Sequence, residues 1–138
     1  MSKRVLIVDD DSRMLSFLER RFIRSGFQPS TASSGEEALA ILKEGVKDEG
    51  DGFSLIFIDL YMPGMDGSEL CKRIRLFDSE TAIYGFAGYE EPLPPKLPNR
   101  SDFTGFFQRP LNLPELLAAS AKKDPSKLGE VGDTFFGL

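Results

Sequence analysis

The sequence contains no histidine, a single cysteine and no long hydrophobic run. Without histidine, Ser-His-Asp catalysis, Cys-His catalysis and His-ligated metal sites are excluded. The one thiol, Cys71, can form no internal disulfide, so we interpret it as a free core cysteine in a reducing, cytoplasmic setting. The apolar stretch at residues 5–8 is too short for a signal peptide or a membrane span.

Clusters of basic residues are also missing. The chain carries 22 acidic and 17 basic residues, which are spread along its length. Nothing therefore favours direct binding of nucleic acid or of an anionic membrane. A length of 138 residues with 41% apolar content is enough for one domain with its own core.

Short apolar runs rich in branched and aromatic residues predict five strands. They lie at residues 5–8, 28–32, 55–58, 82–87 and 103–107. The runs 5–8 and 55–58 are apolar at every position, which is typical of central strands in a parallel sheet that is covered on both faces.

Helix-start patterns alternate with these runs. Ser12 is placed to cap a first helix, which should stop near Gly26. Three later capping-box patterns are Ser34 with Glu37, Asp66 with Glu69, and Asn112 with Glu115. The alternation of strand and helix predicts a doubly wound α/β fold.

Aspartates fall at the predicted ends of two strands, with Asp9, Asp10 and Asp11 after the first run and Asp59 after the third. In open parallel sheets, ligands bind beyond the carboxyl ends of the strands, so we expect these carboxylates to converge. Their repulsion would raise their pKa values unless a cation relieved it, and oxygen-only ligands suit Mg²⁺. A flavin phosphate would need amide donors here rather than negative charges. Asp11 and Asp66 are interpreted as helix-end carboxylates.

Three segments resemble the signature segments of bacterial response-regulator receiver domains. They are residues 8–12 (Val-Asp-Asp-Asp-Ser), residues 58–67 (Ile-Asp-Leu-Tyr-Met-Pro-Gly-Met-Asp-Gly) and the pair Arg109-Pro110. The similarity covers roughly residues 3 to 122. It implies a flavodoxin-like, doubly wound five-stranded parallel sheet in the order 2-1-3-4-5, like that of chemotaxis regulators, with helices on both faces.

The resemblance also implies roles for individual residues. Asp10 and Asp59 would be Mg²⁺ ligands, with the Tyr61 backbone carbonyl as a third ligand and Asp9 acting through water. Asp59 would be the phosphoacceptor that attacks a phosphohistidine on a sensor histidine kinase or a phosphotransfer protein. The chain would then be no enzyme beyond its own Mg²⁺-assisted autophosphorylation and autodephosphorylation.

The sequence departs from the family pattern at the switch positions. Ala87 stands where receivers carry Thr or Ser, and a methyl group cannot donate a hydrogen bond to a phosphate. Arg109 stands in place of the usual Lys; we expect it to pair with Asp59 and the phosphate, the alternative being that it points to solvent. Phe106 takes the place of the switching aromatic, and beside Ala87 we interpret it as a static core ring.

The segment 89–99, where the family has its fourth helix, contains four prolines and is not expected to form a regular helix. We interpret it as a stiff surface loop, the alternative being a P-x-x-P docking ligand. The receiver domain is expected to span residues 1–123, followed by a short tail, 124–138, for which disorder is the default.

Three classes of function compete. The leading one is a phosphoacceptor receiver of a two-component phosphorelay, with Mg²⁺-dependent phosphorylation at Asp59 and output through a downstream protein. The alternative is a degenerate pseudo-receiver that serves as a phosphorylation-independent interaction module. A Mg²⁺-dependent phosphohydrolase would use similar carboxylates, but the sequence offers no second catalytic domain, lid or histidine.

Overall fold

Five parallel strands form one sheet in a computed structural model that describes residues 3–45, 52–93, 102–109 and 112–121. The strand order is β2-β1-β3-β4-β5, and every neighbouring pair is parallel. The predicted doubly wound fold and its strand order are therefore confirmed. In chain order the elements are β1 (Lys3–Val8), α1 (Ser12–Arg24), β2 (Phe27–Ala32), α2 (Gly35–Gly45), β3 (Leu55–Asp59), α3 (Gly67–Arg75), β4 (Ala82–Ala87), β5 (Gly105–Gln108) and α4 (Leu113–Ala121).

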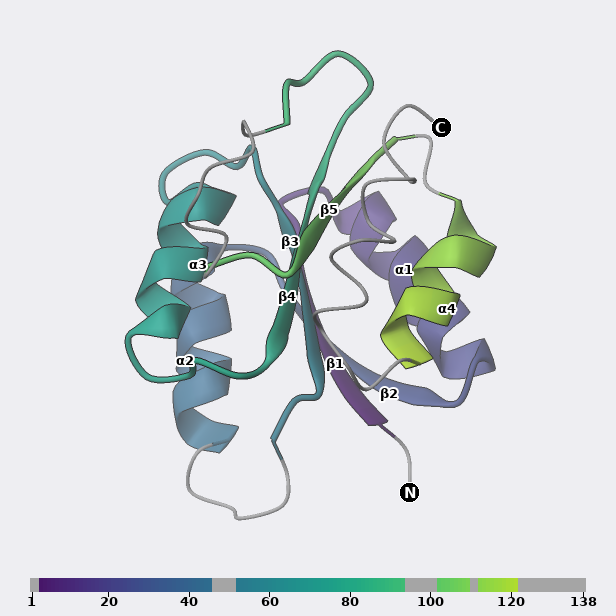
Figure 1. Ribbon diagram of the computed structural model, residues 1–138, viewed down its shortest axis with the longest axis horizontal. Helices are drawn as coiled ribbons and strands as arrows, with labels where there is room; N and C mark the ends of the chain where they lie inside the picture. The colour runs from purple at the N-terminus through teal and green to yellow at the C-terminus, as the bar shows by residue number, and fades with distance from the viewer. Residues whose placement is uncertain (1–2, 46–51, 94–101, 110–111, 122–138) are drawn as a thin grey trace.

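Helices cover both faces of the sheet, with α2 and α3 on one side and α1 and α4 on the other (Figure 1). Strand β1 supplies both cores, because successive side chains of a strand point to opposite faces. Leu6 and Val8 belong to the cluster under α2 and α3, whereas Val5 and Ile7 belong to the cluster under α1 and α4. All four are fully buried, as the unbroken apolar run predicted.

The edge strand β2 is the least buried of the five, and its Pro29 is tolerated because a strand at the edge leaves one side of its backbone unpaired. At the other edge, β5 begins at Gly105 rather than at the predicted position 103. The apolar side chain of Phe103 packs against the α2 and α3 cluster from the preceding turn instead. Its apolar character therefore reflects packing and not strand pairing.

The helix starts largely follow the predicted caps. The carboxylate of Asp66 accepts a hydrogen bond from the Glu69 amide (2.9 Å), and equivalent bonds join Ser34 to Glu37 and Asn112 to Glu115. The first helix differs, because its N-cap is Asp11, which accepts from the Arg13 amide, and not the predicted Ser12. A carboxylate is the stronger acceptor at the positive end of a helix. Asp11 and Asp66 thus have the helix-end roles expected of them.

Cys71 lies in the α2 and α3 core with no exposed surface, and burial raises the pKa of its thiol to about 12. The expectation of a free core cysteine is confirmed. In the proline-rich segment, residues 88–93 and 102–104 are non-helical, while 94–101 lie outside the described residues, as does the predicted tail 124–138.

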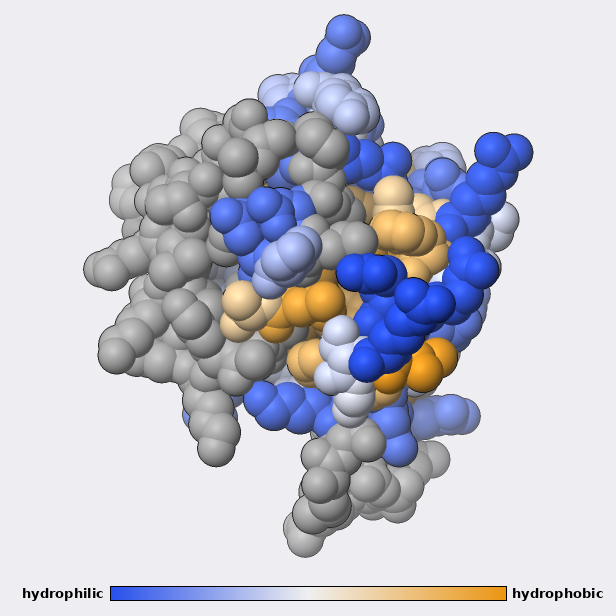
Figure 2. All heavy atoms as spheres, turned by 90° about the vertical axis from the view of Figure 1, so that its right-hand side faces the viewer, coloured by the Kyte–Doolittle hydropathy of each residue, from blue (hydrophilic) through white to orange (hydrophobic). Residues whose placement is uncertain are grey.

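The face formed by α1 and its neighbours shows apolar side chains framed by hydrophilic ones (Figure 2). On α1 itself, Phe17 and Ile23 are exposed. Within the ranges that the structure describes, no helix combines the length and hydropathy needed to cross a membrane.

Candidate phosphoacceptor and cation site

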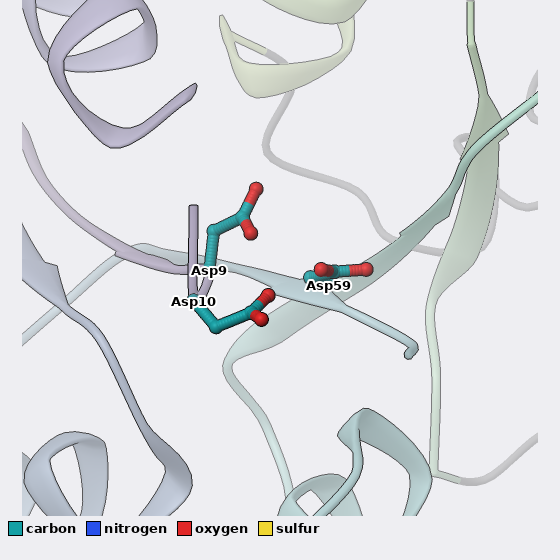
Figure 3. Close-up of side chains that lie close together, drawn as sticks. All are labelled: Asp9, Asp10 and Asp59. Atoms are coloured by element: carbon teal, nitrogen blue, oxygen red, sulfur yellow. The ribbon is translucent and has the colours of Figure 1, made fainter. Parts of the chain in front are cut away.

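Three carboxylates meet beyond the carboxyl ends of β1 and β3. Asp9 and Asp10 follow the last residue of β1, and Asp59 is the last residue of the adjacent β3. One carboxylate oxygen from each residue lies within 4.8 Å of the others. The close-up in Figure 3 shows the side chains gathered at this point of the sheet. The sequence argument for convergence at this edge is therefore supported by the geometry.

Two of the three carboxylates are buried. Asp9 is 1% exposed and Asp59 8%, and they are the only buried charged residues in the described part of the chain. Burial, followed by the charge of Asp9, raises the pKa of Asp59 to about 8, and burial also raises the pKa of Asp9. Because the two carboxylates are adjacent and largely shielded from water, the state in which both are ionised is strongly disfavoured. A cation among them would remove that penalty.

Backbone amides hold the two buried carboxylates in place. The Asp11 amide donates to Oδ1 of Asp9 at 2.9 Å, and the Tyr61 amide donates to Oδ1 of Asp59 at 3.2 Å. Each carboxylate is thus oriented by the chain that follows its own strand. The orientation of both buried carboxylates is therefore set by the backbone.

Arg109 follows β5, and its side chain pairs with Asp9 at the end of β1, although β4 and β3 lie between these two strands in the sheet. Its Nη2 lies 3.5 Å from Oδ2 of Asp9, and the side chain is 29% exposed. Asp59 was the predicted partner, but in the structure the guanidinium pairs with Asp9, the other buried carboxylate. A long, flexible side chain can reach either of two neighbouring carboxylates, so position in the sequence alone does not fix its partner.

The remaining switch positions, Ala87 and Phe106, lie on the adjacent strands β4 and β5. Ala87 is fully buried at the end of β4, and its carbonyl accepts a hydrogen bond from the Arg109 amide at 2.9 Å. Phe106 is half-buried and packs against Phe103, with ring centroids 4.9 Å apart and ring planes tilted by 44°. Tyr61 is exposed, and its hydroxyl donates to the carbonyl of Pro92.

Two residues near the site were missed by sequence reasoning. Glu91 accepts a hydrogen bond from the Gly88 amide, and the Gln108 side chain donates to the carbonyls of Gly88 and Glu91. Glu91 falls in the proline-rich segment, where the sequence gives no periodicity to place a side chain. Only the fold, which turns the chain back over the end of β4, brings this carboxylate toward Asp59.

The fold and the acidic pocket together define a doubly wound α/β domain with a carboxylate site at the carboxyl edge of its sheet. The family model of the response regulator receiver domain matches residues 5–121. The chain therefore belongs to the response regulator receiver family, the signalling domain of two-component systems. The resemblance noted in the three sequence segments is confirmed.

Individual relatives support the same assignment. Sporulation initiation phosphotransferase F of Bacillus subtilis (strain 168) is 29% identical over 127 residues, or 92% of this chain and 98% of that protein. The alkaline phosphatase synthesis transcriptional regulatory protein PhoP of the same organism is 40% identical over 54% of this chain, but over only 29% of its own length. A solved structure of the Vibrio cholerae chemotaxis protein CheY4 superposes with a TM-score of 0.68 at 29% identity, covering 86% of this chain and 95% of that one.

Proposed function

We propose that this chain is a phosphoacceptor receiver that takes phosphate on Asp59 with the help of Mg²⁺ and signals through protein contacts. The observation that carries the proposal is the buried carboxylate group at the ends of β1 and β3, with Asp59 held by the Tyr61 amide. The donor would be a sensor histidine kinase or a phosphotransfer protein. A relative that is itself named a phosphotransferase favours this class of chemistry.

The residues present fit Mg²⁺, because the donor set is oxygen-only and two of its carboxylates are buried and mutually repelling. Asp10, Asp59 and the Tyr61 carbonyl would hold the ion, with Asp9 acting through water. When bound, the ion would neutralise the charge on the transferring phosphoryl group. No ligand other than oxygen is within the group, which disfavours a softer metal.

In the transfer step, a carboxylate oxygen of Asp59 attacks the phosphorus of the phosphohistidine. The new O–P bond forms as the P–N bond breaks, and the electron pair of that bond leaves with the imidazole. The Tyr61 amide keeps the attacking carboxylate oriented. Arg109, at the rim of the pocket, can turn from Asp9 toward the new phosphoryl oxygens.

The test is incubation of the full chain with acetyl phosphate and Mg²⁺, followed by intact-mass measurement and peptide mapping. We expect one added phosphoryl group on Asp59, none in Asp59→Asn, and none when EDTA replaces Mg²⁺. Asp10→Asn should slow the reaction without abolishing the acceptor. Wild-type protein that stays unmodified, or that is modified elsewhere, would refute the proposal.

The second candidate is a pseudo-receiver whose contacts do not depend on phosphate. It is favoured by Ala87, which is buried and lacks a hydroxyl to follow a phosphate, and by Arg109, which is engaged with Asp9. Binding of a partner protein by wild type and by Asp59→Asn, each with and without acetyl phosphate, separates the two. Equal binding in all four cases supports the pseudo-receiver, and phosphate-dependent binding by wild type alone refutes it.

A further inference from the structure

The end of β4 leaves one backbone donor facing the carboxylate pocket. The Leu60 amide donates to the Phe86 carbonyl at 2.9 Å, which is the last rung between β3 and β4. The next rung would join the Gly88 amide to the Leu60 carbonyl, because alternate residues of a strand face the same neighbour. That carbonyl instead accepts from the Gly67 amide at 3.0 Å. The Gly88 N–H is therefore directed toward the side of Asp59 without a ladder partner.

The carboxylate of Glu91 accepts a hydrogen bond from this N–H. Its Oε1 lies 2.5 Å from the Gly88 nitrogen, so the side chain folds back over the residue that follows β4. A Cβ placed at Gly88 would come within 2.8 Å of the same oxygen, which shows how closely the carboxylate covers this glycine. The acceptor is thus internal to the chain, and it carries a negative charge.

Other contacts tie the same turn to the strands on either side. Gln108 of β5 donates from Nε2 to the Glu91 carbonyl at 2.8 Å and to the Gly88 carbonyl at 3.3 Å. From the other side, the Tyr61 hydroxyl donates to the Pro92 carbonyl. Residues 88–92, called here the 88–92 turn, are therefore fastened to β5 and to the chain that leaves β3.

Glu91 is placed where charge at Asp59 affects it. Burial and Asp9 raise the pKa of Asp59, and the charge of Glu91 adds to that effect. The coupling is mutual, because a charge that penalises ionisation of Asp59 is itself repelled by any negative group added there. A phosphoryl group brings both additional negative charge and strong acceptor oxygens.

We propose that Glu91 is an internal latch, whose carboxylate occupies the Gly88 N–H at rest and is expelled when Asp59 carries a phosphoryl group. Expulsion removes the Glu91 side-chain contact with Gly88 and so loosens the 88–92 turn, which Gln108 and Tyr61 still hold through its backbone carbonyls. The switch works by repulsion and by competition for one N–H, so it requires no hydroxyl at Ala87. This inference rests on the proposed phosphorylation of Asp59.

The resting contact is tested without phosphate, by amide hydrogen exchange measured by NMR on the full chain. In Glu91→Ala the Gly88 amide should exchange roughly tenfold faster than in wild type, because a charge-assisted hydrogen bond is lost. Glu91→Gln should fall between, since the amide oxygen still accepts. Glu90→Ala is the matched control, at an exposed neighbouring position, and should leave Gly88 exchange unchanged. Equal Gly88 exchange in wild type and Glu91→Ala would overturn the latch.

The release step is tested with acetyl phosphate and Mg²⁺, with intact mass recorded in parallel. The reporter is the Glu91 backbone amide, which donates to the Gly88 carbonyl at 3.3 Å across the turn. We expect its exchange to accelerate on phosphorylation of wild type and to change little in Glu91→Ala. Gly88→Ala, which displaces only the flexible end of Glu91, should accelerate it without phosphate.

The outcomes separate the two proposals. If mass shows phosphate on Asp59 while wild-type Glu91 exchange stays the same, the latch is wrong and the proposed function stands. If no phosphate is added, the proposed function fails and the release step falls with it, whatever the resting exchange shows.

Discussion

Replacing Asp59 with Asn should stabilise the metal-free protein, although it removes the proposed phosphoacceptor. A pKa raised from 3.8 to about 8 means that the fold disfavours the Asp59 carboxylate. At pH 7 this amounts to at most about 4 kcal/mol, using roughly 1.4 kcal/mol for each tenfold change in proton affinity. Because Asp9 shares the repulsion and can relax when one charge is removed, we expect a gain of about 2 kcal/mol.

The sign of the pH dependence follows from the raised pKa. A folded state that binds its proton more tightly than the unfolded chain loses stability as pH rises from the unfolded value toward the folded one. The free energy of unfolding of metal-free wild type should therefore decline between pH 4 and about 8. The Asp59→Asn variant should lack most of this decline.

Urea unfolding in EDTA, repeated in Mg²⁺ and across this pH range, measures the effect. Mg²⁺ should raise the midpoint of wild type and leave that of Asp59→Asn nearly unchanged. Asp10→Asn is the matched control, because Asp10 is exposed and should alter metal-free stability by less than about 0.5 kcal/mol. A metal-free Asp59→Asn protein that is less stable than wild type at pH 7 would refute the reasoning.

Other predictions concern the frame around the site. Tyr84 is fully buried and its hydroxyl has no hydrogen-bond partner among the described residues, so Tyr84→Phe should raise the free energy of unfolding by about 1 kcal/mol; a loss would show that the hydroxyl is satisfied. Asp66→Ala should lower it by about 1 kcal/mol through loss of the α3 cap, and Asp66→Asn by much less; equal losses would contradict a capping role. A Cβ at Gly67 would collide with the Asp59 backbone carbonyl, so Gly67→Ala should lower the free energy of unfolding by about 2 to 4 kcal/mol. Gly35→Ala should cost less, because it meets the movable side chain of Met65, and the reverse order in urea unfolding would refute this comparison.

The fold could be predicted from the sequence because the signals for its strands and helices are local and repeated. The unbroken apolar run of β3 and the caps at Asp66 and Asn112 each fix one element, and short connections leave few ways to arrange them. The acidic site was readable for the same reason, since Asp9 and Asp59 are attached to the ends of adjacent strands. Their positions follow from the sheet and need no knowledge of side-chain conformation.

The contacts that long side chains make could not be predicted from the sequence in this way. Arg109 was expected at Asp59 and lies at Asp9, because several rotatable bonds let it choose between two carboxylates that are close together. No sequence pattern predicts the position of Glu91, because the turn that carries it has no periodicity. The sequence therefore predicts the groups whose positions are set by the backbone. It does not predict contacts that depend on side-chain conformation.

The contacts of Arg109 and Glu91, which the sequence does not predict, bear on how this receiver could respond to phosphate on Asp59. A hydroxyl at position 87 would follow a phosphate inward, and Ala87 cannot do so. The structure offers instead two charged groups that already engage the pocket: Arg109, which neutralises Asp9, and Glu91, which holds the Gly88 N–H. New negative charge at Asp59 attracts the first and repels the second, so both would move in the same event and in opposite directions. If Asp59 accepts phosphate as proposed, these two groups would couple the phosphate to the surface without a hydroxyl at position 87.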